Sequence, residues 1–219
     1  MLNITEGEIL LVNKPYRWTS FDVIGSLRGL IKHLIGKKIK IGHAGTLDPL
    51  ATGLLIVCTG KATKRIEEFK DFDKEYTGTF TLGATTASYD MEKEVNETFA
   101  TDHITPEMIE EAAKNLSGDI MQIPPMFSAI KVDGKRAYES ARKDKDLGLA
   151  ARPVCVPEFE ITRIEMPEVI SVLFAPKAPI SVRWHAISGW PSTVARTSAL
   201  CAAHGLDRIG LRMHIPLTN

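Results

Sequence analysis

The amino-acid sequence predicts an α+β fold, and three observations lead to this prediction. Two segments, residues 20–35 and 105–117, have the apolar spacing of amphipathic helices. Several shorter segments are continuous aliphatic runs or alternate between apolar and polar residues, as strands do. Helices and strands do not follow one another in the regular strand–helix–strand pattern of a doubly wound parallel sheet. An α+β fold therefore fits the sequence better than a doubly wound one.

The first part of the chain supplies two short strands and one helix. Residues 9–12 and 54–58 are aliphatic runs, and the second run is bounded by Gly53 and Gly60. The helix is expected to begin at a Ser20 cap and to end at Gly36. Its spacing predicts one buried face, formed by Val23, Ile24, Leu27, Ile31 and Leu34.

The later elements are read in the same way. Residues 76–82 alternate and are rich in strand-forming side chains, so they predict a third strand. Thr105-Pro106 is expected to open a second helix, because proline suits the first helical position, and Gly118 is expected to end it. Residues 137–145 predict a further helix and residues 158–165 a further strand. The buried stripe of the second helix is expected to be Met108, Ile109, Ala112, Ala113 and Leu116.

The composition is that of an ordinary globular protein, with 44% hydrophobic and 25% charged residues among 219. No apolar run is long enough for a membrane helix, and the N-terminus lacks the pattern of a secretory signal. Cys58, Cys155 and Cys201 have no paired spacing, so we expect neither a disulfide framework nor a zinc site. We therefore expect a cytoplasmic protein that holds no metal.

Residues 42–53, with the sequence GHAGTLDPLATG, are the most informative part of the chain. Asp48 stands between glycine-flanked turns, is followed by Pro49, and precedes a buried strand. A carboxylate on a rigid turn at the edge of a core suits a nucleophile or a general base. The alternative is that Asp-Pro only begins a turn, with its side chain bonded to nearby amides.

Charge is unevenly distributed although the formal net charge is zero. Residues 1–70 contain eleven Lys and Arg but six Asp and Glu, so this part of the chain is basic. A basic field around one acid suits a polyanionic substrate such as RNA, and an ordinary solvated basic face fits equally well. The basic residues that flank Asp48 in sequence are Lys37, Lys38, Lys40, Lys61, Lys64, Arg65 and Lys70.

Residues 42–55 resemble the signature of the TruB family of tRNA pseudouridine synthases. Further segments resemble the family in the same order: residues 10–15 with Thr19-Ser20, residues 74–76 with 82–85, and residues 122–131 with Gly134, Tyr138 and Ala141-Arg142. These ordered matches cover roughly residues 8–165. The Asp48 signature is long and specific, whereas each of the others is weaker alone.

The resemblance implies a pseudouridine synthase fold: a mixed, largely antiparallel sheet with flanking helices and a central RNA-binding cleft. It implies isomerisation of the uridine at position 55 in the T-loop of tRNA, without a cofactor, by a protein that we expect to be a monomer. Asp48 would be the catalytic nucleophile and the target base would be flipped out of its stack. A non-catalytic module that binds and refolds tRNA is the alternative.

The resemblance also assigns roles to other residues. Tyr76 would stack on the flipped base and His43 would take the gap that the base leaves. By themselves, a strand tyrosine is as easily a core residue, and a loop histidine is more often a turn residue. Possible RNA phosphate contacts are Lys14, Lys61, Lys64, Lys131 and Arg142.

Residues 170–219 differ in character from residues 1–169, which we read as the catalytic domain. Only one of the 27 acidic residues, Asp207, lies in this tail. The family implies a strand here whose arginine pairs with the catalytic aspartate, but residues 175–183 read APKAPISVR. Back-translated with permitted codons and read from the third base, the tail allows FGVVCSKGTYIRSLARDFG and, from Trp190, ALNSGAHLSALRRTRIG, which look like the family. We therefore expect a frameshift near Val169, and the alternatives are a divergent tail or an inactive product of gene decay.

Overall fold

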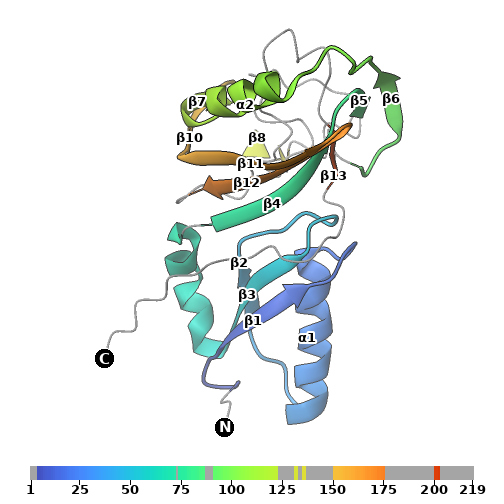
Figure 1. Ribbon diagram of the computed structural model, residues 1–219. Helices are drawn as coiled ribbons and strands as arrows, with labels where there is room; N and C mark the ends of the chain where they lie inside the picture. Colours follow the sequence, from blue (N-terminus) through green and yellow to red (C-terminus); the bar gives the residue numbers. More distant parts are fainter. Residues whose placement is uncertain are drawn as a thin grey trace. The chain divides into compact units, whose positions relative to one another are not determined.

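The computed structural model describes residues 4–72, 74–86, 91–122, 131–132, 135–136, 150–175 and 200–202 (Figure 1). The chain separates into two compact units, with the boundary in sequence between Glu75 and Tyr76. Among the described residues, no helix combines the length and apolarity that crossing a bilayer requires.

The first unit is a three-stranded antiparallel sheet with a helix on each face (Figure 1). In spatial order its strands are β1 (Ile9–Lys14), β3 (Gly53–Thr59) and β2 (Ile41–Ala44). The two helices are α1 (Ser20–Ile35) and the 3₁₀ helix η1 (Gly60–Asp71).

The central strand β3 is buried on both faces. Leu55 and Val57 pack in the cluster that α1 covers, whereas Ile56 and Cys58 pack in the cluster that η1 covers. A strand that is buried on both sides has no polar face to alternate with. This explains why the sequence shows a continuous apolar run here.

The N-cap of helix α1 lies one residue before the predicted one. Thr19 is the N-cap, and its hydroxyl accepts the Asp22 amide while the Asp22 carboxylate accepts the Thr19 amide. The prediction of Ser20 as the cap is therefore wrong. Gly36 ends the helix with φ +72°, as predicted. Leu34 is 65% exposed, so the predicted buried face ends one turn early.

The second unit contains a four-stranded sheet, three two-stranded ribbons and one helix among its described residues. In spatial order the sheet contains β11 (Glu158–Glu165), β12 (Glu168–Ala175), β4 (Lys74–Thr81) and β13 (Leu200–Ala202). The ribbons pair β7 (Gly118–Gln122) with β10 (Arg152–Val156), β5 (Ala84–Thr86) with β6 (Val95–Thr98), and β8 (Lys131–Val132) with β9 (Lys135–Arg136).

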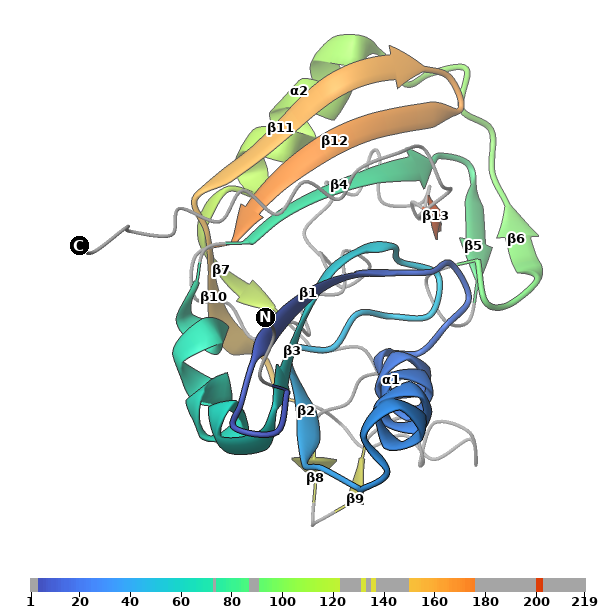
Figure 2. The same ribbon diagram turned by 90° about the horizontal axis from the view of Figure 1, so that it is seen from below.

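Helix α2 (Pro106–Asn115) lies beside β11 and β12, as both views show (Figure 2). Ile109 and Ala113 of this helix pack in one core with Phe159 and Leu173 of the two strands. Thr105 caps α2 as predicted. The helix ends before Gly118, which has φ +89° and begins β7 instead.

The structure confirms the predicted strands near residues 9–12, 54–58, 76–82 and 158–165. It adds β2, η1, β12, β13 and the three ribbons, which the sequence did not predict. The helix predicted at residues 137–145 lies outside the described residues.

Candidate active site

Asp48 lies in the loop that connects β2 to β3, in the first unit. The loop turns tightly at this residue, because the Ala51 amide donates to the Asp48 carbonyl at 3.1 Å. The loop ends at Gly53, which has φ +117° and donates its amide to Asn13 Oδ1 at 3.1 Å. Leu47 is buried, whereas Asp48 is only half-buried. The structure therefore presents a partly exposed carboxylate on an anchored turn.

Ser20 ties this loop to the start of α1. Its hydroxyl accepts the Leu47 amide at 2.9 Å and donates to the Leu47 carbonyl at 3.2 Å. Ser20 is 2% exposed, so these two hydrogen bonds to the backbone are shielded from water. Since Leu47 immediately precedes Asp48, the two bonds hold the backbone from which the carboxylate projects.

Lys14 is the third anchor of the loop. Its side chain is fully buried. The ammonium donates three hydrogen bonds to carbonyl oxygens, to Trp18 at 2.6 Å, Pro15 at 3.0 Å and Pro49 at 3.2 Å. Pro49 follows Asp48, and its carbonyl also accepts the Arg17 amide at 2.8 Å. The loop is therefore held on both sides of Asp48.

The sequence predicted Lys14 as a possible contact for RNA phosphate, and this position corrects that prediction. An ammonium that is fully buried, with all three donors directed at carbonyl oxygens, has no donor left for a phosphate. Burial lowers the pKa of Lys14, and the carboxylates of Asp48 and Asp22 act in the opposite direction. Lys14 thus also supplies positive charge near Asp48.

His43 lies in β2, at the position paired with Val57 of β3. It is half-buried, and its Nδ1 makes a short hydrogen bond to the Gly45 carbonyl. When Nδ1 carries the proton that makes this bond, Nε2 remains an acceptor. His43 and Asp48 therefore belong to one strand–loop segment, with Gly45 between them.

Tyr76 belongs to the second unit, where it lies in β4. It is half-buried and packs against the core that contains Phe80 and Phe159. Part of the ring is accordingly a core side chain, which is one of the two readings that the sequence left open.

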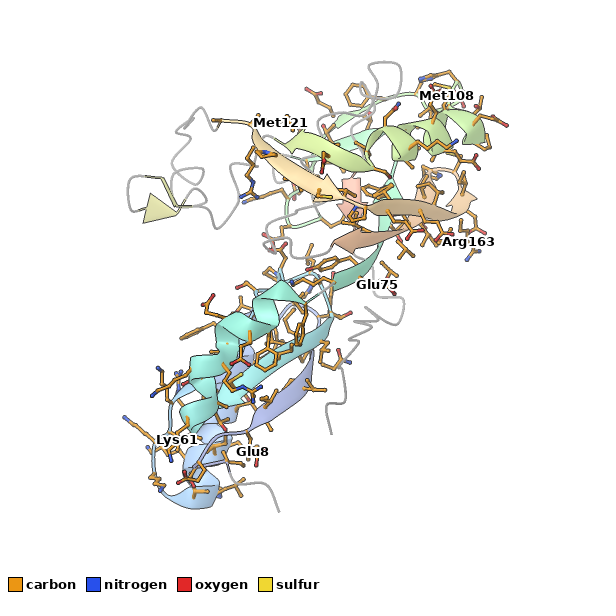
Figure 3. All side chains as sticks on the ribbon, turned by 90° about the vertical axis from the view of Figure 1, so that its left-hand side faces the viewer. Glu8, Lys61, Glu75, Met108, Met121 and Arg163 are labelled. Carbon is orange, nitrogen blue, oxygen red and sulfur yellow. The ribbon has the colours of Figure 1, made fainter. Side chains whose placement is uncertain are left out.

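The basic residues predicted as phosphate contacts are distributed over several elements. Lys61 and Lys64 are exposed on η1, and the Lys61 ammonium pairs with Glu6 at 2.5 Å. Figure 3 shows Lys61 near Glu8, at the end of the first unit opposite Glu75. Asp48 precedes β3 and Lys61 follows it, so about 20 Å of strand separates the two segments. Their closeness in sequence suggested that these lysines lie beside Asp48, but the structure places them at the other end of β3.

Two further phosphate contacts were predicted, at Lys131 and Arg142. Lys131 lies in β8, and Arg142 lies outside the described residues.

Ser20 and the turn at residues 15–18 were not predicted as parts of the site. The pairing of Lys14 with Gly53 across β1 and β3 brings that turn to the Asp48 loop, and such a pairing is not visible in the sequence alone.

Comparisons with known proteins identify one family, and its model matches parts of both units. A family model described as TruB family pseudouridylate synthase (N terminal domain) matches residues 32–176. The tRNA pseudouridine synthase B of Phocaeicola vulgatus is 56% identical over 169 residues, which are 77% of this chain and 72% of that protein. The protein of that name from Flavobacterium johnsoniae is 54% identical over 166 residues, 75% of this chain and 72% of its own length. The 169 matched residues leave 50 of the 219 residues outside the first match.

Solved structures show the same fold at low identity. A chain in the crystal structure of a Cbf5-Nop10-Gar1 complex superposes with a TM-score of 0.61 and 23% identity. That match covers 90% of this chain and 47% of the other, so this chain spans about half of its length. A chain in an H/ACA RNP bound to a substrate RNA containing 2′-deoxyuridine gives a TM-score of 0.58 with 20% identity. These likenesses confirm the predicted α+β fold.

Proposed function

Because this chain belongs to the TruB family of pseudouridylate synthases, we propose that it isomerises uridine to pseudouridine in tRNA, with Asp48 as the catalytic group. The observation that carries the proposal is the anchored loop around Asp48, in a chain 56% identical to a tRNA pseudouridine synthase B. We further propose the T-loop uridine at position 55 as the target, and a cytoplasmic monomer that acts without a cofactor.

The chemistry requires one bond to be broken and another to be made. In one route the Asp48 carboxylate attacks ribose C1′, and the electrons of the C1′–N1 bond leave with uracil N1. The uracil rotates, C5 attacks C1′, and the carboxylate leaves; the proton on C5 is then lost and N1 gains one. In a second route Asp48 removes the proton on ribose C2′, the C1′–N1 bond breaks with its electrons leaving on uracil, and a glycal with a C1′–C2′ double bond forms. Uracil C5 then bonds to C1′ while C2′ regains its proton from Asp48, and C5 loses its proton while N1 gains one. Both routes need a carboxylate that is aimed at the sugar, and the anchors of the loop favour this orientation.

We propose RNA contacts for the other predicted residues, except Lys14. Tyr76 would stack on the flipped uridine with its exposed part, and His43 would take the place of the base in the RNA loop. Lys61, Lys64, Lys131 and Arg142 would contact phosphates of the RNA. For Lys14 we propose a positioning role through the Asp48 loop, in place of the phosphate contact.

The direct test is an Asp48→Asn variant assayed with tRNA that carries tritium at uridine C5. Isomerisation releases this tritium, because C5 becomes the atom bonded to the sugar. We expect release to stop in Asp48→Asn while tRNA binding persists. Asp102→Asn is the control, since Asp102 is an exposed carboxylate of the second unit. Release that survives the Asp48 substitution contradicts the assignment of Asp48.

A chain that binds tRNA but releases no tritium in either form has a different function. That result favours a module that binds and refolds tRNA without chemistry. Cooperative unfolding then separates such a module from an inactive product of gene decay, which should give a broad transition or none.

For the tail we propose that residues 170–219 are a shifted reading of the gene. The support is its composition, with one acidic residue. The match to the family model runs on to residue 176, and β12 ends at Ala175, so the family-like part of the chain reaches a few residues beyond Val169. The shifted reading contains the family-like string that this chain lacks, including the arginine that the resemblance pairs with Asp48. An adjacent guanidinium keeps a carboxylate ionised and oriented. Loss of this arginine would therefore leave the Asp48 carboxylate without its partner.

Genomic DNA across the codons for residues 167–171 tests the tail directly. One missing or extra base relative to the present reading makes residues 170–219 an artefact of the frame. DNA that confirms the present frame and encodes no family-like peptide in the shifted one contradicts the proposal, and the tail is then a divergent segment.

A further inference from the structure

The turn between β1 and α1 lies directly against the Asp48 loop. It consists of residues 15–18, and the Lys14 ammonium bonds to the carbonyls of Pro15, Trp18 and Pro49. The Arg17 amide donates to the same Pro49 carbonyl at 2.8 Å. The Lys14 ammonium and the Pro49 carbonyl therefore join the turn to the residue after Asp48 by hydrogen bonds.

Arg17 adopts an unfavourable backbone conformation in this turn. Its φ is +65°, and it is the one non-glycine residue with positive φ in the described part of the chain. Glycine takes this conformation without strain, whereas an L side chain does not. Backbone strain of this kind concentrates at functional sites. The side chain at this position is therefore a candidate for a role outside the fold.

The side chains of the turn are displayed on its surface. Tyr16 is 38% exposed and Trp18 is 41% exposed, although both are large hydrophobic groups. The Arg17 guanidinium lies 5.5 Å from the centre of the Tyr16 ring. Exposed aromatic rings stack on unpaired bases, and a guanidinium binds phosphate, so the turn displays both kinds of group.

We propose that Tyr16, Arg17 and Trp18 form a contact surface for unpaired RNA nucleotides beside the flipped uridine. The aromatic rings stack on a base and Arg17 binds a backbone phosphate. The proposal rests on the proposed function for the identity of the RNA, and its location rests on the bonds to Pro49. Charge favours RNA as the occupant, because a guanidinium complements phosphate.

The chain provides a matched control for this surface on α1. Phe21 is 67% exposed, and the Arg28 guanidinium lies 6.0 Å from the centre of its ring. This pair has the same exposed aromatic and guanidinium chemistry as Tyr16 and Arg17. In the described part of the chain neither side chain is hydrogen-bonded to the Asp48 loop. If such pairs bound RNA in a general way, substitutions at both sites would therefore lower the affinity equally.

The experiment measures binding of a T-arm RNA hairpin to the full chain, at several salt concentrations, and needs no turnover. Trp18→Ala should raise the Kd about tenfold, and Trp18→Phe should recover most of the loss, since loss of one stacked base has this size. Arg17→Gly should lower the slope of log affinity against log salt by about 0.7, as loss of one phosphate contact does. Phe21→Ala and Arg28→Gln should leave both quantities unchanged.

Urea unfolding distinguishes a lost RNA contact from a destabilised fold. Arg17→Gly relieves the positive φ, so this variant should unfold at no lower urea concentration than the parent. Affinity that is unchanged in Trp18→Ala and Arg17→Gly, or lowered as much in the control variants, overturns the proposal. So does a parent chain that fails to bind the hairpin. Tritium release is measured separately, so failure of the isomerase proposal leaves the binding result readable.

Discussion

Lys14 carries much of the order of the site in one side chain. Its ammonium satisfies three carbonyls inside the protein, one of them next to Asp48. Lys14→Met fills the space but leaves these oxygens without their donor, so we expect the free energy of unfolding to fall by about 3 kcal/mol. Urea unfolding measures this loss. Lys38→Met, at an exposed lysine, should change stability by less than about 0.5 kcal/mol, and an equal loss in both variants contradicts the anchor.

The same lysine gives a pH dependence with a definite sign. Burial lowers the pKa of Lys14 below its ordinary value of 10.5. Between the folded pKa and 10.5 the unfolded chain binds more protons than the folded chain, so the free energy of unfolding rises with pH in that window. Below the folded pKa the lysine is charged in both states and adds no slope. Urea titrations from neutral pH toward 10.5 should show this contribution in the parent and not in Lys14→Met.

Two hydroxyls in the first unit make the same pair of bonds at different places. Ser20 holds Leu47 through both its amide and its carbonyl, and Thr59 holds Glu8 in the same way at 2.9 and 3.4 Å. Ser20→Ala and Thr59→Val should each lower the free energy of unfolding by about 1–2 kcal/mol. Only Ser20→Ala should speed amide hydrogen exchange at residues 46–48 and slow pseudouridine formation by about tenfold. Equal effects of the two variants on the loop would show that Ser20 does not position Asp48.

The glycines of the two helices in the first unit differ in whether a larger side chain could replace them. A Cβ at Gly25 or Gly29 meets nothing within 4 Å, whereas a Cβ at Gly60, with φ +50°, meets the Thr5 carbonyl at 2.7 Å. Gly25→Ala and Gly29→Ala should each raise the free energy of unfolding by about 0.5–1 kcal/mol, because alanine restricts the unfolded chain and favours the helix. Gly60→Ala should lower it. Urea unfolding of the three variants checks this order, and a loss at Gly25 or Gly29 would indicate a packing role there.

The elements also show what the sequence could reveal. The apolar run of β3 and the glycine that ends α1 were readable, because burial and C-capping leave local patterns, whereas the N-cap was placed one residue too late. The 3₁₀ helix η1 has no 3.6-residue period, and the short β2 has too few residues to show alternation, so both were missed. Asp48 and its neighbours were found through a resemblance. The burial of Lys14 and the positive φ of Arg17 depend on contacts with Pro49, 35 and 32 residues away, and no local pattern reports them.

At the scale of the whole molecule, the chain combines a loop around Asp48 that is anchored by hydrogen bonds with a tail that contains one acidic residue. Beyond Ala175 the described residues are Leu200–Ala202, a three-residue strand that pairs with Thr79–Thr81 of β4. So short a pairing adds little stability by itself. The tail and the remainder of the chain can therefore be tested separately.

Three versions of the protein decide what the tail does: the chain as it stands, a chain that ends at Ala175, and a chain read in the shifted frame from Val169 onward. We expect the first two to unfold over a broader urea range and to release tritium more slowly than the third, because neither carries the family-like strand and its arginine. The third should unfold in one sharper transition at higher urea and release tritium, since a guanidinium beside Asp48 keeps the carboxylate ionised. If ending the chain at Ala175 instead removes activity that the present chain possesses, the tail is a working part of this protein and the frameshift is wrong.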